Sequence, residues 1–202
     1  MPAILSNLRA TVHISLLLAI IYLGAYVLTG GIAVNDALWM GIARWTHVVS
    51  GIMWIGLLWY FNFVQIPNMP NIPDEQKPAI GKVIAPAALF WFRWGAAATV
   101  LTGLFVAGLR GYTVEVLSLG LAAEVYTPQY SFIGIGMWMA IIMAYNVWFI
   151  IWPNQQIALG LVEADAEAKP KAARTAMLFS RTNTLLSFPM LIAMAMAQTV
   201  FG

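Results

Sequence analysis

One stretch of the second apolar segment decides how this chain is to be understood: Arg44-Trp45-Thr46-His47-Val48-Val49-Ser50-Gly51-Ile52-Met53-Trp54-Ile55-Gly56. Arg44 and His47 stand three positions apart in a run that is otherwise suited to the hydrocarbon of a membrane. An unpaired arginine at the centre of a bilayer costs about 3 kcal/mol or more. An ionisable side chain kept at such a cost indicates a functional site, so we expect the site of this chain here.

The composition is that of an integral membrane protein. Of the 202 residues, 61% are hydrophobic and 9% are charged, whereas soluble domains carry about 25% charged residues. The formal net charge is +2, and no basic run is long enough to indicate nucleic-acid binding. The chain has no cysteine, which excludes disulfides, thiolate metal sites and covalently attached haem c.

The apolar segments predict one all-α integral membrane domain over residues 1–202. Five stretches are long enough to cross about 30 Å of hydrocarbon as helices, at about 12–33, 38–66, 86–109, 131–152 and 174–201. Lysines and arginines gather before the first span, between the second and third, and before the fifth. This distribution predicts a cytoplasmic N-terminus, a periplasmic C-terminus and a multi-pass protein of the bacterial inner membrane, in contact with the lipid bilayer.

Two connections on the predicted cytoplasmic side differ in character. Five of the ten prolines fall within residues 66–86, which predicts an extended, semi-rigid connection there. Residues 155–168 predict a short helix at the membrane surface, closed by Pro170. Neither segment carries a recognisable binding motif, so we expect both to connect spans.

Polar residues of the second span share one face. At 100° of rotation per residue, Arg44, His47, Gly51 and Asn62 fall within a sector of about 60°. Trp54 completes the same face. Lipid cannot satisfy such a stripe, so we expect it to face protein, a cofactor or a water-filled cavity.

The later spans carry further polar residues. Asn183 and Ser187 belong to a polar stripe of the fifth span, Arg181 flanks it, and Asn146 is the strongly polar residue of the fourth. Together with Asn62 these side chains could line a substrate path, or they could hydrogen-bond the helices to one another. In the third span, small residues at four-residue spacing predict a helix-packing seam: Gly95, Thr99 and Gly103.

His47 suits the axial position of haem iron. Neutral imidazole is a common haem ligand, and membrane helix bundles hold haem b between facing helices. His47 would then bind the iron, Gly51 and Trp54 would adjoin the macrocycle, and Arg44 would pair with a propionate or a substrate anion. His13 begins the first span near the opposite face, so the iron would have His47 alone, add a methionine, or lie at a subunit interface. No second histidine or intramembrane carboxylate is at hand for a non-haem metal.

Three blocks of sequence together resemble one known family. They are residues 44–62, residues 146–155 and residues 180–190, which include Arg44-Trp45-Thr46-His47, Asn146-Val147-Trp148-Phe149 and Ser180-Arg181-Thr182-Asn183. These blocks resemble the urate oxidase N-terminal domain of bacterial membrane-bound urate hydroxylases, and the resemblance spans most of the chain from about residue 38. The Arg-x-x-His element is also similar to that of small haem-binding membrane oxidases of porphyrinogen synthesis.

The resemblance implies an activity. In that family the membrane domain is joined to a C-terminal cytochrome c domain, which takes electrons from urate oxidation. This chain looks like a short form without that domain, because it has no Cys-x-x-Cys-His attachment motif. The resemblance therefore implies an oxidoreductase of the urate hydroxylase type that passes electrons to a separate cytochrome c.

Two further interpretations stay open. The chain could be a non-catalytic membrane subunit, packed against a larger respiratory or photosynthetic complex or assembled with copies of itself. A transporter is the third interpretation. It ranks last because five spans without repeats or broken helix pairs match few transporter folds. A pigment in the purified protein favours the redox interpretation. A colourless protein that co-purifies with a larger complex favours the subunit interpretation.

Overall fold

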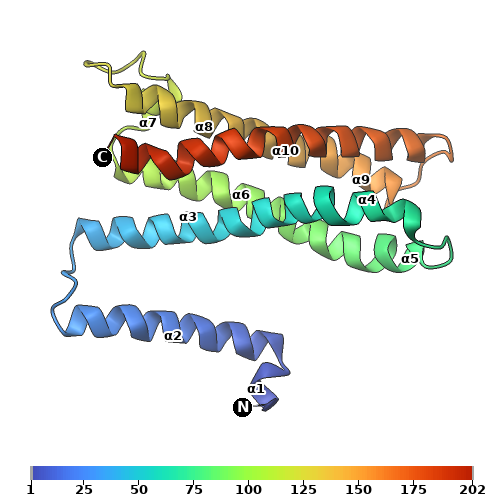
Figure 1. Ribbon diagram of the computed structural model, residues 1–202, viewed down its shortest axis with the longest axis horizontal. Helices are drawn as coiled ribbons and strands as arrows, with labels where there is room; N and C mark the ends of the chain where they lie inside the picture. The colour runs from blue at the N-terminus through green and yellow to red at the C-terminus, as the bar shows by residue number, and fades with distance from the viewer. Residues whose placement is uncertain (1, 202) are drawn as a thin grey trace. The chain divides into compact units, whose positions relative to one another are not determined.

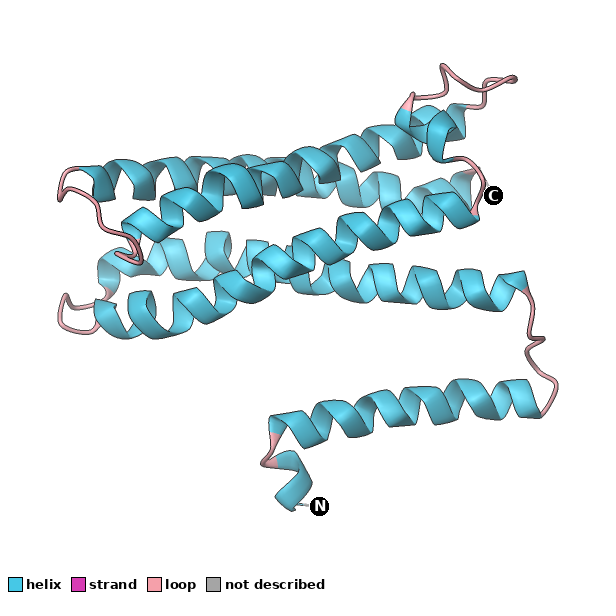
Figure 2. Cartoon of the chain, turned by 180° about the vertical axis from the view of Figure 1, so that it is seen from behind, coloured by secondary structure: helices cyan, strands magenta, loops and turns pink. Residues whose placement is uncertain are grey.

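The computed structural model describes residues 2–201, which form helices and turns with no strand among them (Figures 1 and 2). The chain divides into two units, residues 1–42 and residues 43–202. Five helical stretches are long and apolar enough to cross a membrane: Leu8–Leu28, Asp36–Asn71, Lys77–Leu109, Pro128–Ala158 and Ala168–Val200. The predicted all-α fold with five helices of membrane-spanning length is therefore confirmed.

The first unit contains a short helix, α1 (Pro2–Leu5), and the first long helix, α2 (Leu8–Leu28). The side chain of Asn7 caps α2 by accepting a hydrogen bond of 3.2 Å from the Ala10 N–H. The helix ends before Gly30, whose φ of +75° is a left-handed conformation that glycine adopts without strain. The span predicted at 12–33 thus starts and ends about one turn too late.

The second unit is a four-helix bundle. Its long helices are α3 (Asp36–Trp59), which enters the unit at Ala43, α6 (Ala85–Leu109), α8 (Pro128–Tyr145) and α10 (Ala168–Val200), and they lie side by side in Figures 1 and 2. The shorter segments are η1 (Tyr60–Gln65), α4 (Ile66–Asn68), η2 (Met69–Asn71), α5 (Lys77–Ala79), η3 (Ile80–Ile84), α7 (Thr113–Leu117), η4 (Asn146–Ile151) and α9 (Trp152–Ala158).

Three of the helical stretches widen into a π-helical turn two residues before a proline. The segments η1, η3 and η4 precede Pro67, Pro86 and Pro153. A proline has no N–H to donate, and its ring presses on the carbonyl four residues earlier. The chain adapts through bonds to the carbonyl five residues back, as between the Ile66 N–H and the Phe61 oxygen. The helices consequently continue through these prolines.

This continuity corrects both predicted connections. Residues 66–86 are not extended: helix runs to Asn71 and resumes at Lys77, and Lys77 bridges to Asp74 at 2.6 Å in the short turn between them. The hydrogen bond from Lys77 lowers the pKa of the Asp74 carboxyl group. The predicted surface helix at 155–168 is also wrong, because α9 ends at Ala158 and Pro170 lies in the first turn of α10, where a missing N–H costs nothing.

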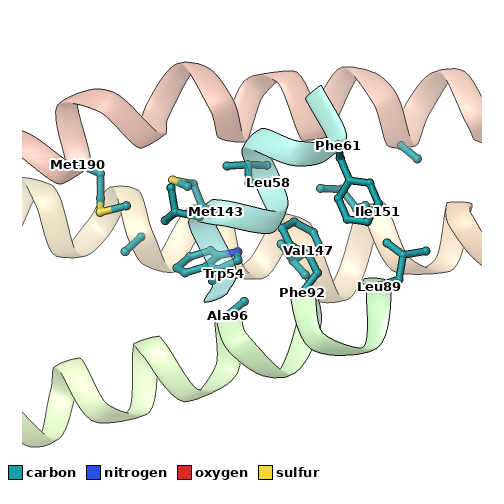
Figure 3. Close-up of a cluster of buried hydrophobic side chains, with 13 residues drawn as sticks. Trp54, Leu58, Phe61, Leu89, Phe92, Ala96, Met143, Val147, Ile151 and Met190 are labelled. Carbon is teal, nitrogen blue, oxygen red and sulfur yellow. The ribbon is translucent and has the colours of Figure 1, made fainter. Parts of the chain in front are cut away.

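The core of the second unit is apolar and draws on every long helix (Figure 3). Trp54 and Leu58 of α3 are fully buried among Phe92 of α6 and Met143 of α8. A Cβ at Gly95 would lie 3.3 Å from the backbone nitrogen of Trp54, so α3 and α6 approach closely there. The predicted packing seam is confirmed at this residue. Within a bilayer such contacts stabilise the bundle through van der Waals packing.

A second, smaller cluster holds the short helix α7 against α8. Val116 is fully buried in it, and a Cβ at Gly134 would lie only 2.1 Å from the Val116 carbonyl oxygen. The indole of Trp138 donates a hydrogen bond of 2.9 Å to the Leu117 carbonyl. The connection between α6 and α8 is therefore packed against the bundle.

Candidate functional site

A cavity of about 560 Å³ lies among the four long helices of the second unit. This volume falls within the range of about 300–1,000 Å³ that is usual for cofactor and ligand sites. Its lining is mostly apolar and includes indole rings and thioethers from three helices: Trp54, Trp59, Met137, Met190 and Met194. The structure brings together the four residues predicted to bind a cofactor, because all of them line this cavity: Arg44, His47, Gly51 and Trp54.

The ring of His47 is anchored to α6 through one nitrogen. Nδ1 lies 2.9 Å from the carbonyl oxygen of Thr99 and 3.2 Å from Oγ1 of Thr102. A carbonyl oxygen can only accept, so Nδ1 carries the hydrogen. In the neutral ring Nε2 then has a free lone pair, and no residue of the described chain is hydrogen-bonded to it. A histidine held in this way is oriented as metal-ligating histidines are.

Gly103 makes room for this ring. A Cβ at residue 103 would lie 2.9 Å from Cε1 of His47 and 3.3 Å from Nδ1, which is closer than carbon atoms normally approach. Thr99 and Gly103 of the predicted seam therefore do more than pack helices. They seat the imidazole, with Gly103 next to Cε1 and Thr99 accepting its hydrogen bond.

Two arginines meet at one end of the cavity. Nη2 of Arg44 lies 3.4 Å from Oε1 of Gln198, and Nη2 of Arg110 donates a short hydrogen bond to the same oxygen. The two nitrogens are thus no more than about 6 Å apart, where two unit charges repel by about 3 kcal/mol at an effective dielectric constant of about 20. The one ion pair among the described residues joins Lys77 to Asp74, so no carboxylate neutralises this pair.

The polar residues predicted to line a substrate path hydrogen-bond helices to one another. Asn146 donates a hydrogen bond of 2.8 Å to Oδ1 of Asn183, and Asn183 donates to the Met143 carbonyl at 2.9 Å. Both amides are buried, and neither lines the cavity. This pair joins α8 and η4 to α10, as interhelical hydrogen bonds do in membrane proteins.

Asn62 and Ser187 make the corresponding bonds between α10 and the helix formed by α3 and η1. Asn62 donates to Oγ of Ser180 at 2.7 Å, and the indole of Trp59 donates to Oγ of Ser187 at 3.0 Å. Neither Asn62 nor Ser187 lines the cavity. Because η1 holds about one extra residue per turn, the 100° rotation that placed Asn62 on the His47 face no longer applies beyond Trp59.

Two further arginines lie apart from the cavity. Arg181 is exposed on α10 and is not brought to the other predicted residues. The guanidinium carbon of Arg93 lies 3.3 Å from the ring centroid of Trp152, a cation–π contact. Nε and Nη1 of Arg93 are buried without a hydrogen-bond partner in the described chain.

Sequence reasoning missed several residues around the cavity. Thr102, Arg110 and the lining methionines carried no pattern of their own, since each belongs to a different helix or connection from His47. One signal was present: Arg110 is the only lysine or arginine within residues 110–130. An isolated charge at a helix end was a cue to look for a partner nearby.

Comparison with known proteins bears on the second half of the chain. Residues 106–199 match the family model for the urate oxidase N-terminal domain. The match runs from the last turn of α6 through α8, η4, α9 and α10, so it contains two of the three resembling blocks and leaves out the one around His47. No curated protein and no solved structure matches the chain. The resemblance is thus confirmed over residues 106–199, which are similar to the urate oxidase N-terminal family.

Proposed function

We propose that this chain is a membrane-embedded redox protein that binds haem b through Nε2 of His47. The observation that carries the proposal is the anchored imidazole at the wall of a cavity of about 560 Å³. Nδ1 is engaged by the Thr99 carbonyl, which leaves the opposite nitrogen as the ligand atom. The urate oxidase N-terminal match supports a relation to the membrane domains of urate hydroxylases.

The residues around the cavity suit a porphyrin better than a bare metal ion. Among the described residues no three His, Cys, Asp or Glu side chains come together, so a bare ion at His47 would have fewer than three such ligands. A porphyrin brings four nitrogen ligands of its own and needs one or two from the protein. The apolar lining, with the indoles of Trp54 and Trp59, matches the faces of such a ring.

Methionines of the cavity could help His47 to hold the haem iron. The thioethers of Met137, Met190 and Met194 line the same cavity as His47, and they come from α8 and α10. Methionine paired with histidine raises the reduction potential of haem iron, as in electron-transfer cytochromes. One of these sulfurs could hold the iron together with His47, while Thr99 keeps the histidine oriented.

Haem supplies one-electron oxidation and reduction when it is bound. We propose that the electrons come from urate or a similar planar anion, the substrate class that the family name indicates, and pass to a separate cytochrome c. Arg181, exposed on α10, is a candidate first contact for such an anion. The protein contributes the ligand, an apolar surround that excludes water, and positive charge at the cavity end.

The test is a haem titration of detergent-purified protein, followed as the Soret absorbance of oxidised and dithionite-reduced samples. His47→Ala is compared with His13→Ala, a histidine outside the cavity. We expect one haem per chain in the wild type and in His13→Ala, and loss of the Soret shift in His47→Ala.

Two results would contradict the proposal. One is a colourless wild type that takes up no haem. If such a preparation also co-purifies in fixed ratio with a larger complex, the chain is a non-catalytic membrane subunit. The other is equal haem binding by the wild type and His47→Ala, which would remove the assigned ligand while leaving a haem site elsewhere.

A further inference from the structure

The meeting of Arg44 and Arg110 at Gln198 needs an explanation beyond helix packing. Both guanidinium groups hydrogen-bond one neutral amide oxygen, and no carboxylate lies within ion-pair distance of either in the described chain. The carboxy-terminal ends of α6 and α10 offset part of this charge through their helix dipoles. Dipoles do not form the directed, bidentate bonds for which a guanidinium is shaped, so most N–H groups of both side chains remain available.

We propose that Arg44, Arg110 and Gln198 form a carboxylate clamp that binds the two propionates of the haem. Arg44 and Gln198 also line the cavity that holds His47, so the clamp and the iron ligand serve one ligand. Haem carries its two propionates on the same edge of the ring, and the two Nη2 atoms, no more than about 6 Å apart, offer one guanidinium group to each anion. Gln198 is the neutral spacer that keeps the arginines side by side.

This assignment rests on the proposed function and adds the orientation of the ligand. Arg44, Arg110 and Gln198 would hold the carboxylate edge of the ring at the end of the bundle where α6 and α10 finish, and Trp54 would adjoin its apolar part. Arg110 stands at the carboxy-terminal cap of α6, and Arg44 lies about two turns into α3. Three separate helices therefore contribute to the clamp, so a ligand with two carboxylates would form hydrogen bonds with side chains of more than one helix.

The experiment compares haem b with its dimethyl ester, in which both propionates are methylated and the iron and ring are unchanged. Each is titrated into wild type, Arg44→Gln, Arg110→Gln and the control Arg174→Gln in a non-ionic detergent. Arg174 is exposed near the start of α10 and does not line the cavity. The ester also serves as a folding control, since a variant that binds it normally has an intact cavity.

We expect the wild type and Arg174→Gln to bind haem b at least tenfold more tightly than the ester. In Arg110→Gln and Arg44→Gln the affinity for haem b should fall by about 10-fold to 100-fold, the usual effect of losing a charge-assisted hydrogen bond, with little change for the ester. The preference for the free acid should then nearly vanish in both variants.

Three results would overturn the assignment, and they separate it from the proposed function. Equal wild-type affinity for haem b and the ester refutes the clamp but leaves haem binding standing. An equal loss of both ligands in Arg110→Gln means that Arg110 only supports the fold. If wild type binds neither compound, the proposed function fails first and the clamp fails with it.

Discussion

Gly103→Ala perturbs the site through the smallest possible change. The new methyl carbon would lie 2.9 Å from Cε1 of His47, whereas carbon atoms in contact prefer about 3.5–4.0 Å. Since Gly103 and Thr99 both belong to α6, the methyl group pushes the ring away from the helix that anchors it. A displacement of about 0.6 Å or more is needed to relieve the contact.

That displacement is enough to break the anchor. The Nδ1 to Thr99 oxygen distance is 2.9 Å, and an added 0.6 Å brings it to the roughly 3.5 Å at which a hydrogen bond is lost. Losing the group that orients a metal-binding histidine typically lowers affinity by about 10-fold to 100-fold, or about 1.4–2.8 kcal/mol. Alanine is also a better helix former than glycine by about 1 kcal/mol, so the variant should stay folded.

The assay measures haem affinity and thermal unfolding of the same preparations. Gly24→Ala is the matched control, because a Cβ there meets nothing within 4 Å. We expect weaker haem binding in Gly103→Ala with little change in unfolding temperature, and no change of either in Gly24→Ala. Wild-type affinity in Gly103→Ala would refute the argument that a fixed imidazole holds the ligand.

Three further predictions concern contacts between the helices of the second unit. Asn183→Ala leaves the Asn146 amide buried without its acceptor and should lower the free energy of unfolding by about 1–3 kcal/mol, with haem affinity unchanged. Denaturant titration measures the free energy of unfolding, and haem titration measures the affinity. Gly134→Ala places a methyl group 2.1 Å from the Val116 oxygen and should destabilise by about 1–3 kcal/mol or more, measured as a lower midpoint of unfolding. Ser187→Ala removes the acceptor of an α3 indole and should cost only about 0.6 kcal/mol, typical of interhelical hydrogen bonds in membranes; a larger loss would mean that this bond organises the bundle.

The sequence predicted the long helices well because each one depends on the apolar residues of its own segment. Apolar runs of sufficient length report membrane-length helices directly, and all five were found. Proline misled the prediction of the connections. The prolines within residues 66–86 predict a break in the helix, but Pro67 and Pro86 each follow a π-helical turn that absorbs the missing N–H, so the helix continues.

The sequence predicted the part of the candidate site that lies on α3. His47, Arg44, Gly51 and Trp54 lie on one helix, so helical periodicity alone placed them on one face, and all four line the cavity. The rest of the site comes from separate helices. Nothing in the α3 sequence could reveal that Thr99 accepts the His47 hydrogen bond, because that pairing depends on how α3 and α6 pack.

The polar residues of α10 show the same limit. Their stripe predicted either a substrate path or hydrogen bonds between helices, and Asn183 and Ser187 make such hydrogen bonds. Periodicity could not distinguish a substrate path from interhelical bonds, since either satisfies buried polar groups. The partners on α3, η1 and η4 decide that question, and they became visible only in the folded bundle.

Chemical rescue of His47→Gly tests whether the imidazole of His47 binds the haem iron. Removing the imidazole leaves space beside Gly103, where free imidazole can enter and bind the iron from the same side. We expect His47→Gly to lose the Soret band of bound haem and to regain it when millimolar imidazole is added, with no such response in the wild type. A His47→Gly protein that binds haem as tightly as the wild type without imidazole would show that His47 is not the ligand.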